Sequence, residues 1–484
     1  MQHASTPPTL PLATDQSDII IALATPQGTG AIAVIRISGT NAISLVNAYF
    51  KGKNLEKQAT HTLHLGVIVT ESKHDKPKNH SFTTLDEVLV SVFRSPTSYT
   101  KEDSIEISTH GSPFIVQKII ELFLSNGARL AKQGEFTLRA FANGRFSLSQ
   151  AEAVADLIAC DSEQALQLAL GQMRGGFSVE IKRLRSELIY FASLLELELD
   201  FGEEDVEFAS RKDLKALIEQ ILRVVNGLRA SFSVGNVLKN GIATVIAGKP
   251  NAGKSTLMNV LMNEERSIVS SMAGTTRDVV EDVMFLKGIK FRLSDTAGIR
   301  TNTSDEIEQI GVERTFKKLK NAQLILYIFD ASQTSEGELE QEIEALDRPK
   351  EAVLLLVGNK IDNTIDFSIT QNSYTNFFSN YNFVFVSSKD RLNIDALISR
   401  MVEVSQGNAF LQEHTVSNLR HYDCLLKTAQ SLESALEGLA FNTKTSDLIA
   451  MDIRRSLHHL GEITGEITTD DLLETIFSKF CIGK

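Results

Sequence analysis

The spacing of apolar residues changes along the chain, and each spacing pattern predicts a different kind of domain. Up to about residue 143, short apolar runs bounded by turn residues predict strands over residues 18–25, 31–37, 63–70, 88–93 and 104–109. One helix is expected over residues 113–124, with Ser112 as its N-cap and Pro113 at its first position. The polar segment from residue 71 to 84 is expected to be an exposed loop. Strands with few helices are typical of an α+β domain.

Helical spacing dominates the next part of the chain. Apolar residues recur with helical period over residues 147–200, with interruptions expected at Gly171 and at Gly175–Gly176. A second helix is predicted over about 211–234, and the helical spacing returns over about 415–479. Because neither stretch buries its apolar stripe alone, we expect the two to pack into one bundle around an inserted domain.

These spacing patterns predict a multidomain protein with an α+β N-terminal domain, an α-helical bundle domain and an inserted α/β domain. The expected division is a disordered tail at 1–17, the N-terminal domain at 18–143, the first part of the helical domain at 144–240, the inserted domain at 241–405, and the second part of the helical domain at 406–484. A length of 484 residues agrees with this division, because one hydrophobic core rarely serves so long a chain.

The composition bears on three properties of the protein: nucleic-acid binding, cellular compartment and membrane anchoring. The net charge of −12 argues against broad, nonspecific binding of nucleic acid, although a local basic patch remains compatible with it. Cys160, Cys424 and Cys481 lie far apart without metal-ligand spacing, which favours a reducing cytosol. The sequence contains neither an apolar run of the length that spans a bilayer nor a basic signal-peptide start, so we expect a cytoplasmic protein without a membrane anchor.

Residues 248–255 fit the phosphate-binding pattern G-x-x-x-x-G-K-[ST]. A predicted strand over 241–246 precedes the motif and a predicted helix follows it, which is the setting that such a loop requires. Lys254 suits the β- and γ-phosphates, and the Ser255 hydroxyl suits Mg²⁺. The residues expected to contact nucleotide here are Asn251, Ala252, Gly253, Lys254, Ser255 and Thr256.

Two later motifs select the base. In the N-K-x-D box, Asp362 can accept hydrogen bonds from two guanine donors, which adenine does not offer, and the stem of Lys360 can stack on the base. Ser388 occupies the alanine position of an S-A-K motif, whose backbone N–H meets guanine O6. The nucleotide is therefore predicted to be GTP. The expected contacts are Asn359, Lys360, Asp362, Ser387, Ser388 and Lys389.

Two segments between these motifs fit the switch regions of GTPases. Asp295 begins a D-x-x-G motif and can hold Mg²⁺ through water, and the Gly298 N–H can sense the γ-phosphate. Thr276 is the residue expected to complete the magnesium shell in the triphosphate state. The expected nucleotide contacts in these segments are Ser270, Ser271, Met272, Ala273, Gly274, Thr275, Thr276, Asp295, Thr296, Ala297 and Gly298.

The residue after D-x-x-G is unusual. Many small GTPases place a water-orienting glutamine there, but this chain has Ile299, which cannot orient water. Either the domain barely hydrolyses GTP alone, or another side chain orients the attacking water. The candidates are Arg277, Arg300 and the acidic run 305–308.

With these motifs in place, the chain closely resembles the MnmE (TrmE) family of tRNA uridine-modification GTPases over nearly everything after residue 17. Besides the nucleotide motifs, the marks of the resemblance are Ala24-Thr25-Pro26, Arg36-Ile37-Ser38-Gly39, Gly134-Glu135-Phe136-Thr137, Arg139-Ala140-Phe141, Gln150-Ala151-Glu152-Ala153 and Phe480-Cys481-Ile482-Gly483-Lys484.

The resemblance implies a cytoplasmic homodimer, joined through N-terminal domains that bind 5-formyltetrahydrofolate or a related folate. It also implies a heterotetramer with the flavoprotein MnmG, which supplies the FAD. The implied reaction adds an aminomethyl or carboxymethylaminomethyl group to C5 of the wobble uridine of certain tRNAs, with hydrolysis of GTP that depends on K⁺.

The resemblance also implies roles for single residues. K⁺ would be held by the Asn251 side chain together with oxygens of Ser270, Met272 and Thr275. Glu308 would orient the attacking water. The spacing between Asp295 and Glu308 is one residue longer than the commonest spacing in the family, so Glu308 is aligned through the Ile-Gly pair that follows it. The folate contacts implied by the resemblance are Arg36, Glu106, Arg145 and Lys484, with Arg145 standing where the family has a lysine.

Other interpretations remain open at this stage. Cys481 could be a thiolate nucleophile near the folate or a structural thiol. A ribosome-assembly GTPase of the Era/EngA type would share several motifs, but no KH-like G-x-x-G loop follows residue 405. A membrane-remodelling GTPase would need an amphipathic or apolar anchor, which the sequence lacks. The basic clusters at 182–185 and 454–455 could contact RNA or be solvated helix faces.

Overall fold

The computed structural model describes residues 18–71, 82–200, 210–264, 282–295, 319, 322–349, 351–363, 371, 373–374, 377–406, 415–441 and 445–484, with the backbone alone at 71, 198–200, 263–264, 282, 294–295, 406 and 441. The chain forms two compact units. The first comprises Met1–Ala159, Ala169–Asn226 and Asp423–Lys484, and the second comprises Cys160–Leu168 and Gly227–Tyr422. The three-domain division expected from the sequence stays a prediction.

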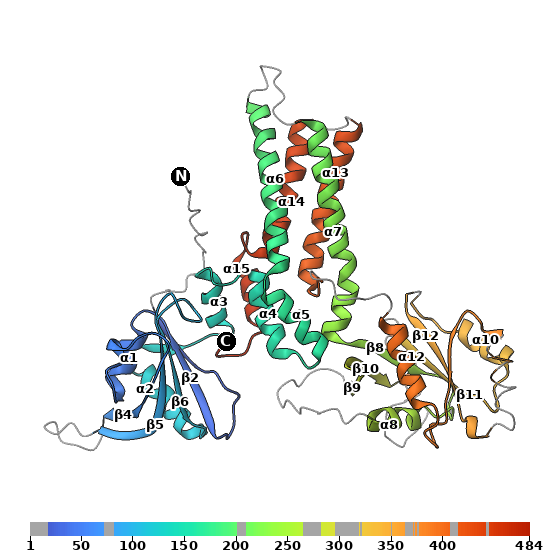
Figure 1. The fold of residues 1–484 in the computed structure, drawn as a ribbon, viewed down its shortest axis with the longest axis horizontal. Coiled ribbons are helices and arrows are strands. Elements are labelled where there is room, and N and C mark those ends of the chain that lie inside the picture. Colours follow the sequence, from blue (N-terminus) through green and yellow to red (C-terminus); the bar gives the residue numbers. More distant parts are fainter. Residues whose placement is uncertain are drawn as a thin grey trace, which may run out of the picture. The chain divides into compact units, whose positions relative to one another are not determined.

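The first unit contains a mixed sheet with the strand order β3-β4-β5-β6-β2-β1-β7 (Figure 1). Neighbouring strands run antiparallel except β1 and β7, which are parallel. The elements of this region are β1 (Ile19–Leu23), β2 (Ile32–Ser38), α1 (Ala42–Tyr49), β3 (Phe50–Lys51), a 3-10 turn (Leu55–Lys57), β4 (Thr62–Glu71), β5 (Phe82–Phe93), β6 (Ser104–His110), α2 (Pro113–Leu124), β7 (Ala128–Leu130) and α3 (Glu135–Ala142).

Strand alternation places one set of side chains in the core with α1 and α2 and the other set on the opposite face. That face is covered where Ile20 and Ala22 pack against Phe136 of α3, and it is open at Ile32, Leu63 and Leu65. Ile35, Ile37, Ile105 and Ile107 are fully buried in the same cluster as residues of α1 and α2. The register puts Arg36 opposite Glu106 on the other face of the sheet. This alternation explains why β1, β2, β4, β5 and β6 were predictable from apolar spacing, whereas the short strands β3 and β7 were not predicted. The helix α2 was predictable from its helical spacing together with Ser112 and Pro113.

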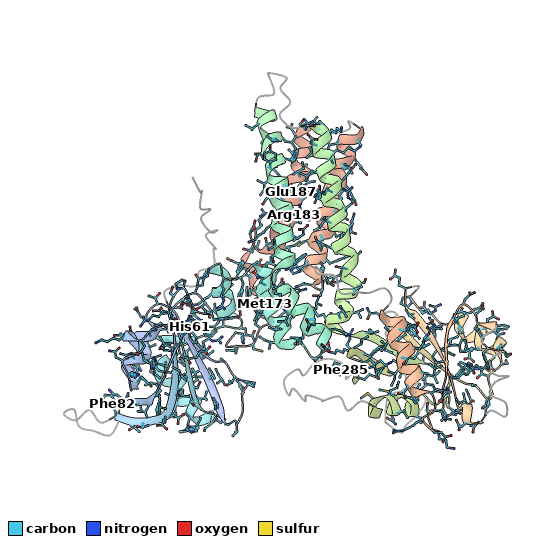
Figure 2. All side chains as sticks on the ribbon, in the orientation of Figure 1. His61, Phe82, Met173, Arg183, Glu187 and Phe285 are labelled. Atoms are coloured by element: carbon cyan, nitrogen blue, oxygen red, sulfur yellow. The ribbon has the colours of Figure 1, made fainter. Side chains whose placement is uncertain are left out.

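One local prediction needs correction, two helices were missed, and one predicted cap is confirmed in position only. β5 begins at Phe82, which Figure 2 labels, so the predicted loop over residues 71–84 is too long; residues 82–84 pair with β4 although their side chains are exposed. The helices α1 and α3 were not predicted. Ser112 does occupy the N-cap of α2, but its side chain makes no capping hydrogen bond.

Helices form the rest of the first unit as described, and α5, α7 and α13 each have residues in both units. Their bounds are α4 (Leu148–Ala159), α5 (Glu163–Met173), α6 (Gly176–Asp200), α7 (Arg211–Asn240), α13 (Leu419–Phe441), α14 (Ser446–Thr464) and α15 (Asp470–Phe477). α14 lies beside α6 (Figure 1). The predicted break at Gly171 is wrong, because one glycine costs a helix only about 1 kcal/mol. Gly175, at a φ of +80°, lies in the break between α5 and α6.

The basic cluster at 182–185 is largely engaged within the chain. Arg183 pairs with Glu180 and Glu187 on α6, and Figure 2 labels Arg183 and Glu187 on this helix. Arg185 donates to the carbonyl of Leu457 and pairs with Glu466. These contacts favour a structural role for Arg183 and Arg185 over a phosphate-binding one.

A buried ion network fastens α3 to the sheet. Glu135, 2% exposed, accepts hydrogen bonds from Arg129 Nη1 (2.9 Å), from Arg139 Nη2 (3.2 Å) and from the Lys132 backbone (2.8 Å). Burial alone would raise the pKa of Glu135, but the hydrogen bonds from Arg129 and Lys132 outweigh it and hold this pKa below its usual range.

We expect Glu135→Gln to lower the free energy of unfolding by about 3 kcal/mol at neutral pH, because it removes a buried carboxylate shared by Arg129 and Arg139 and leaves their charges to Asp18 and Glu102. A depressed folded-state pKa stabilises the protein above the unfolded pKa. The difference between the two proteins should therefore shrink as the pH falls below about 4. Denaturant titrations across this range measure it. Glu121→Gln, which removes an exposed pair with Lys118, should cost less than about 1 kcal/mol; an equal loss in both variants would contradict the assigned role.

The second unit contains a sheet with the order β13-β12-β11-β8-β10-β9, in which only the β9–β10 pair is antiparallel among the described strands. The elements wholly within this unit are β8 (Ile242–Ala247), α8 (Lys254–Glu264), β9 (Asp282–Leu286), β10 (Ile289–Asp295), β11 (Leu324–Asp330), α10 (Glu336–Glu344), β12 (Val353–Asn359), a 3-10 turn (Ile361–Asn363), β13 (Asn382–Phe385) and α12 (Ile394–Gln406). The carboxyl ends of the parallel strands therefore share one edge, where such sheets bind ligands. No helix in the described ranges is long and apolar enough to cross a membrane.

Candidate functional site

The loop between β8 and α8 passes very close to neighbouring backbone and side chains. Gly248 has a φ of +134°, and a Cβ there would lie 2.0 Å from the carbonyl oxygen of Ile328 in β11. Gly253 has a φ of +95°, and a Cβ there would lie 2.2 Å from Asn359 Nδ2. Both positions therefore require glycine, in shape as well as in backbone conformation.

The two lysines of this loop differ in their contacts. The Lys254 ammonium donates to the carbonyls of Gly248 (2.8 Å) and Lys249 (2.7 Å), so it lies within the curve of the loop. Lys249 instead pairs with Glu338 and Glu342 on α10. The loop thus gathers a cation at the N-terminus of α8, an arrangement that attracts phosphate.

One amide side chain joins the loop to the two base-recognition motifs. Asn359, 2% exposed, donates from Nδ2 to the carbonyl of Ala252 (2.9 Å). Its Oδ1 accepts from the backbone N–H (3.0 Å) and from the hydroxyl (2.9 Å) of Ser388. The serine that replaces the usual alanine therefore adds a hydrogen bond that sequence reasoning missed.

The carboxylate of Asp362 is held in place by a hydroxyl. Asp362 Oδ1 accepts from Ser387 Oγ (2.7 Å), and that same oxygen of Ser387 accepts from the Asp390 backbone (3.1 Å). These bonds fix the side chain in the short turn after β12, where the sequence predicts the guanine acceptor.

Lys360 has a partner that was not predicted. Its ammonium lies 2.8 Å from Asp330 Oδ2, at the end of β11, while its backbone adopts a φ of +64°. Burial would raise the pKa of Asp330, but hydrogen bonds from Lys360 and Ser332 lower it. An acidic residue closing a fully apolar strand was the signal in the sequence that could have identified Asp330.

Several predicted site residues cannot be placed. The residues that lie outside the described part of the chain are Ser270, Ser271, Met272, Ala273, Gly274, Thr275, Thr276, Thr296, Ala297, Gly298 and Glu308. Ile299 and the alternatives Arg277 and Arg300 lie outside it too. The backbone of Asp295 is described; it ends β10, paired in parallel with Ile246 of β8.

A second cluster of predicted residues forms on the open face of the sheet in the first unit. Arg36 donates from Nε (2.9 Å) and Nη2 (2.8 Å) to Glu106 Oε1, and from Nη1 to the carbonyl of Gly483 (3.3 Å). Burial, followed by the charge of Arg36, lowers the pKa of Lys484. Arg36, Glu106 and Lys484 are therefore neighbours, although they come from opposite ends of the sequence.

An aromatic ring connects the fourth predicted residue to this cluster. The guanidinium groups of Arg36 and Arg145 each lie 5.1 Å from the centroid of Tyr99. Arg145 also donates to the carbonyl of Ser98 (2.6 Å), and Tyr99 hydrogen-bonds Thr137 through its hydroxyl. Sequence reasoning did not single out Tyr99, and no local motif marks it.

The stretch from Phe480 to Lys484 is seated against the N-terminal sheet region. Phe480 is buried, and Ile482 forms an antiparallel bridge with Gln133. Gly483 has a φ of +98°, and a Cβ there would lie 2.3 Å from the carbonyl oxygen of Leu23. Cys481 is exposed within this fixed stretch.

Known proteins resemble this chain over nearly all of its length. A model of the MnmE helical domain matches residues 148–481, and a model of the N-terminus of the GTP-binding protein TrmE matches residues 19–145. The tRNA modification GTPase MnmE of Cytophaga hutchinsonii is 53% identical over 97% of this chain and 99% of that protein. The chain belongs to the MnmE family of tRNA modification GTPases. The MnmE proteins of Christiangramia forsetii and of Bacteroides fragilis strain YCH46 are 49% and 46% identical, over 97% and 90% of this chain and 99% and 91% of theirs.

Solved structures share a smaller part of the chain. A crystal structure of an Aquifex aeolicus Era variant bound to GDP and aluminium fluoride is 27% identical, covering 39% of this chain and 65% of that one with a TM-score of 0.26. The MnmE assignment rests on the full-length relatives and the two family models. These relatives and family models identify a tRNA modification GTPase and not the ribosome-assembly GTPase that the sequence motifs had left as an alternative.

Proposed function

We propose that this MnmE protein hydrolyses GTP in a potassium-dependent cycle and works with the flavoprotein MnmG. Together they would add a carboxymethylaminomethyl or aminomethyl group to C5 of the wobble uridine of certain tRNAs, using a tetrahydrofolate one-carbon unit. The observation that carries the proposal is the match to an MnmE protein along 97% of the chain, which includes both clusters described above.

The nucleotide loop suits both proposed ions. Ser255, exposed in the first turn of α8, offers a hard hydroxyl oxygen of the kind that Mg²⁺ prefers, and Thr276 would complete that shell. Asn251 is exposed with a φ of +64°; with Ser270, Met272 and Thr275 it would hold K⁺. When bound, the two ions would neutralise charge that develops on the phosphates.

We expect GTP turnover to be much faster in potassium than in sodium, and Glu308→Ala to bind GTP normally but hydrolyse it at least about 100-fold more slowly. The reason is that Glu308 would act on the attacking water in the transition state alone, so ground-state binding is spared. Asn251→Ala should lose the potassium response. Steady-state phosphate release in the two salts measures both effects.

Glu306→Ala is the matched control, since it removes a carboxylate from the same acidic run and should retain the rate. Equal rates in the two salts together with an unaffected Glu308→Ala would reject the mechanism, while GTP binding would be untouched.

We propose that the second cluster, formed by Arg36, Glu106, Arg145 and Lys484, would bind the folate. Arg36, Arg145 and Lys484 supply positive charge for an anionic ligand, Glu106 accepts hydrogen bonds, and Tyr99 offers an aromatic surface. The folate would supply the one-carbon unit. The chain's own residues would hold and orient it, and Cys481 could contribute a nucleophilic thiolate from the adjoining stretch.

The open face of the same sheet supports the proposed homodimer. Ile32, Leu63 and Leu65 are 66%, 58% and 63% exposed, and the strand register puts them on the face that carries Arg36 and Glu106. Large exposed apolar groups gathered on one face are typical of association surfaces. We propose that two N-terminal domains meet here, and that the dimer assembles with MnmG into a heterotetramer that acts on tRNA.

A further inference from the structure

Two imidazoles and a thiol converge on one carboxylate in the first unit, away from both clusters described above. Glu462, in the last turn of α14, has Oε2 3.0 Å from His459 Nδ1 and Oε1 3.8 Å from His458 Nε2. The thiol of Cys424, near the start of α13, lies 3.9 Å from Glu462 Oε2. Neither the nucleotide motifs nor the folate cluster uses any of these side chains.

The spacing of these atoms suits a small tetrahedral ion. One ligand atom from each of His458, His459 and Glu462 lies within 4.8 Å of the others. Ligands about 2.0–2.3 Å from a tetrahedral Zn²⁺ stand roughly 3.3–3.8 Å apart, so His458, His459 and Glu462 need only rotamer adjustment to close around an ion. The sulfur of Cys424 adjoins Glu462 but stands outside this mutually close group, so it would have to turn toward the ion to become the fourth ligand.

The four side chains range from exposed to buried, as expected for a site between two helices. The side chains of His458, His459 and Glu462 are 53%, 23% and 30% exposed, and Cys424 is 5% exposed. Lys427, which lies one turn from Cys424 on α13, is itself paired with Asp423 at 2.7 Å, which reduces its repulsion of an ion. An ordinary surface pair between His459 and Glu462 would account for one of these contacts, but not for the convergence of the thiol and the second imidazole.

We propose that His458, His459, Glu462 and Cys424 form a binding site for one divalent transition-metal ion of the zinc type, which would link α13 to α14. Imidazole nitrogen and thiolate sulfur select such an ion over Mg²⁺, which prefers oxygen ligands. Because α14 leads through Gly465 and α15 to the stretch 480–484, the ion would brace the helix that supports the folate cluster.

The test is metal binding by the full-length protein. In buffer with excess Mg²⁺ and no nucleotide, titration with Zn²⁺ against a chromogenic chelator should show one tight site per chain. Co²⁺ in its place should give the visible bands of a tetrahedral complex together with a thiolate charge-transfer band. Zn²⁺ should also raise the melting temperature, since it binds the folded chain.

The variants decide which side chains are ligands. His459→Gln and Cys424→Ser should each lower the Zn²⁺ affinity by about 10-fold or more, and Cys424→Ser should remove the charge-transfer band. His458→Gln, at a largely exposed position, gives a ligand variant that will not disturb the core. The matched controls are His110→Gln, which breaks another histidine–carboxylate pair, and Cys160→Ser; both should bind as the parent protein does.

Fewer than one tight site per chain, equal affinities for His459→Gln and His110→Gln, or a Co²⁺ complex without the thiolate band would each overturn the proposal. Melting curves recorded without metal separate a ligand effect from a general loss of fold.

Discussion

Replacing Asp362 by asparagine should weaken GTP binding by about 3 kcal/mol, or roughly 100-fold, and make xanthosine triphosphate the preferred nucleotide. The carboxylate is expected to accept two hydrogen bonds from guanine, and bonds to a charged acceptor are each worth about 1.5–3 kcal/mol. Asparagine keeps one acceptor oxygen and presents an NH₂ group to a base that offers further donors.

The contacts of Ser387 sharpen this expectation. Its oxygen already accepts from the Asp390 backbone, so its hydroxyl hydrogen is directed at residue 362. In Asp362→Asn, the Ser387 hydroxyl would donate its hydrogen bond to the amide oxygen of the asparagine, which would direct the NH₂ group toward the base. That group repels a guanine donor but suits the C2 carbonyl of xanthine.

Competition binding with the two nucleotides measures the switch. Asp390→Asn, the same chemical change at an exposed position of the neighbouring loop, should leave the preference for GTP intact. If Asp362→Asn still prefers GTP, this carboxylate does not recognise the base.

Substitution of one glycine near the end of the sequence should abolish tRNA modification without affecting GTP hydrolysis. Gly483→Ala would place a Cβ 2.3 Å from the Leu23 carbonyl at a φ of +98°, so the stretch has to leave its seat. The Gly483 carbonyl would then leave Arg36, and Lys484 would lose its place in the cluster. Deleting residues 482–484 should have the same effect.

Nucleoside analysis of tRNA from a complemented deletion strain, together with phosphate release by the purified protein, measures the two activities separately. Gly127→Ala is the matched control: its φ is +105°, but a Cβ there would meet nothing within 4 Å. It should cost backbone strain alone and keep modification. A parallel loss of GTP hydrolysis in Gly483→Ala would mean that the stretch supports folding or the nucleotide domain instead.

The fold could be predicted from the sequence wherever burial follows a simple period. The strand residues Ile35, Ile37, Ile105 and Ile107 alternate with polar or less buried neighbours, and the buried face of α2 repeats at helical spacing. Phe82 to Thr84 escaped prediction because β-pairing holds them without burying them. Gly171 misled because a helix packed along its length tolerates one glycine.

The same distinction applies to the candidate sites. Gly253, Asn359 and Asp362 could be found from the sequence because nucleotide chemistry fixes their spacing. Tyr99 could not, because no local motif marks it and Arg145 lies 46 residues further along the chain (145 − 99). Asp330 had a local signal at the end of an apolar strand, but its pairing with Lys360, 30 residues later (360 − 330), could not be predicted from that signal. The convergence on Glu462 was hidden for the same reason, because the cysteine spacing in the sequence gave no metal pattern.

The position of Asn359 has a consequence for how the nucleotide is sensed. Its amide touches Ala252 in the phosphate loop and Ser388 in the base-recognition loop at once, with no room between it and Gly253 for even a methyl group. Binding of the base can therefore be coupled to binding of the phosphates through the Asn359 side chain, without any rearrangement of the sheet. In thermodynamic terms, guanine and triphosphate should bind with a positive coupling free energy, and a fragment carrying either moiety alone should gain affinity when the other is supplied separately.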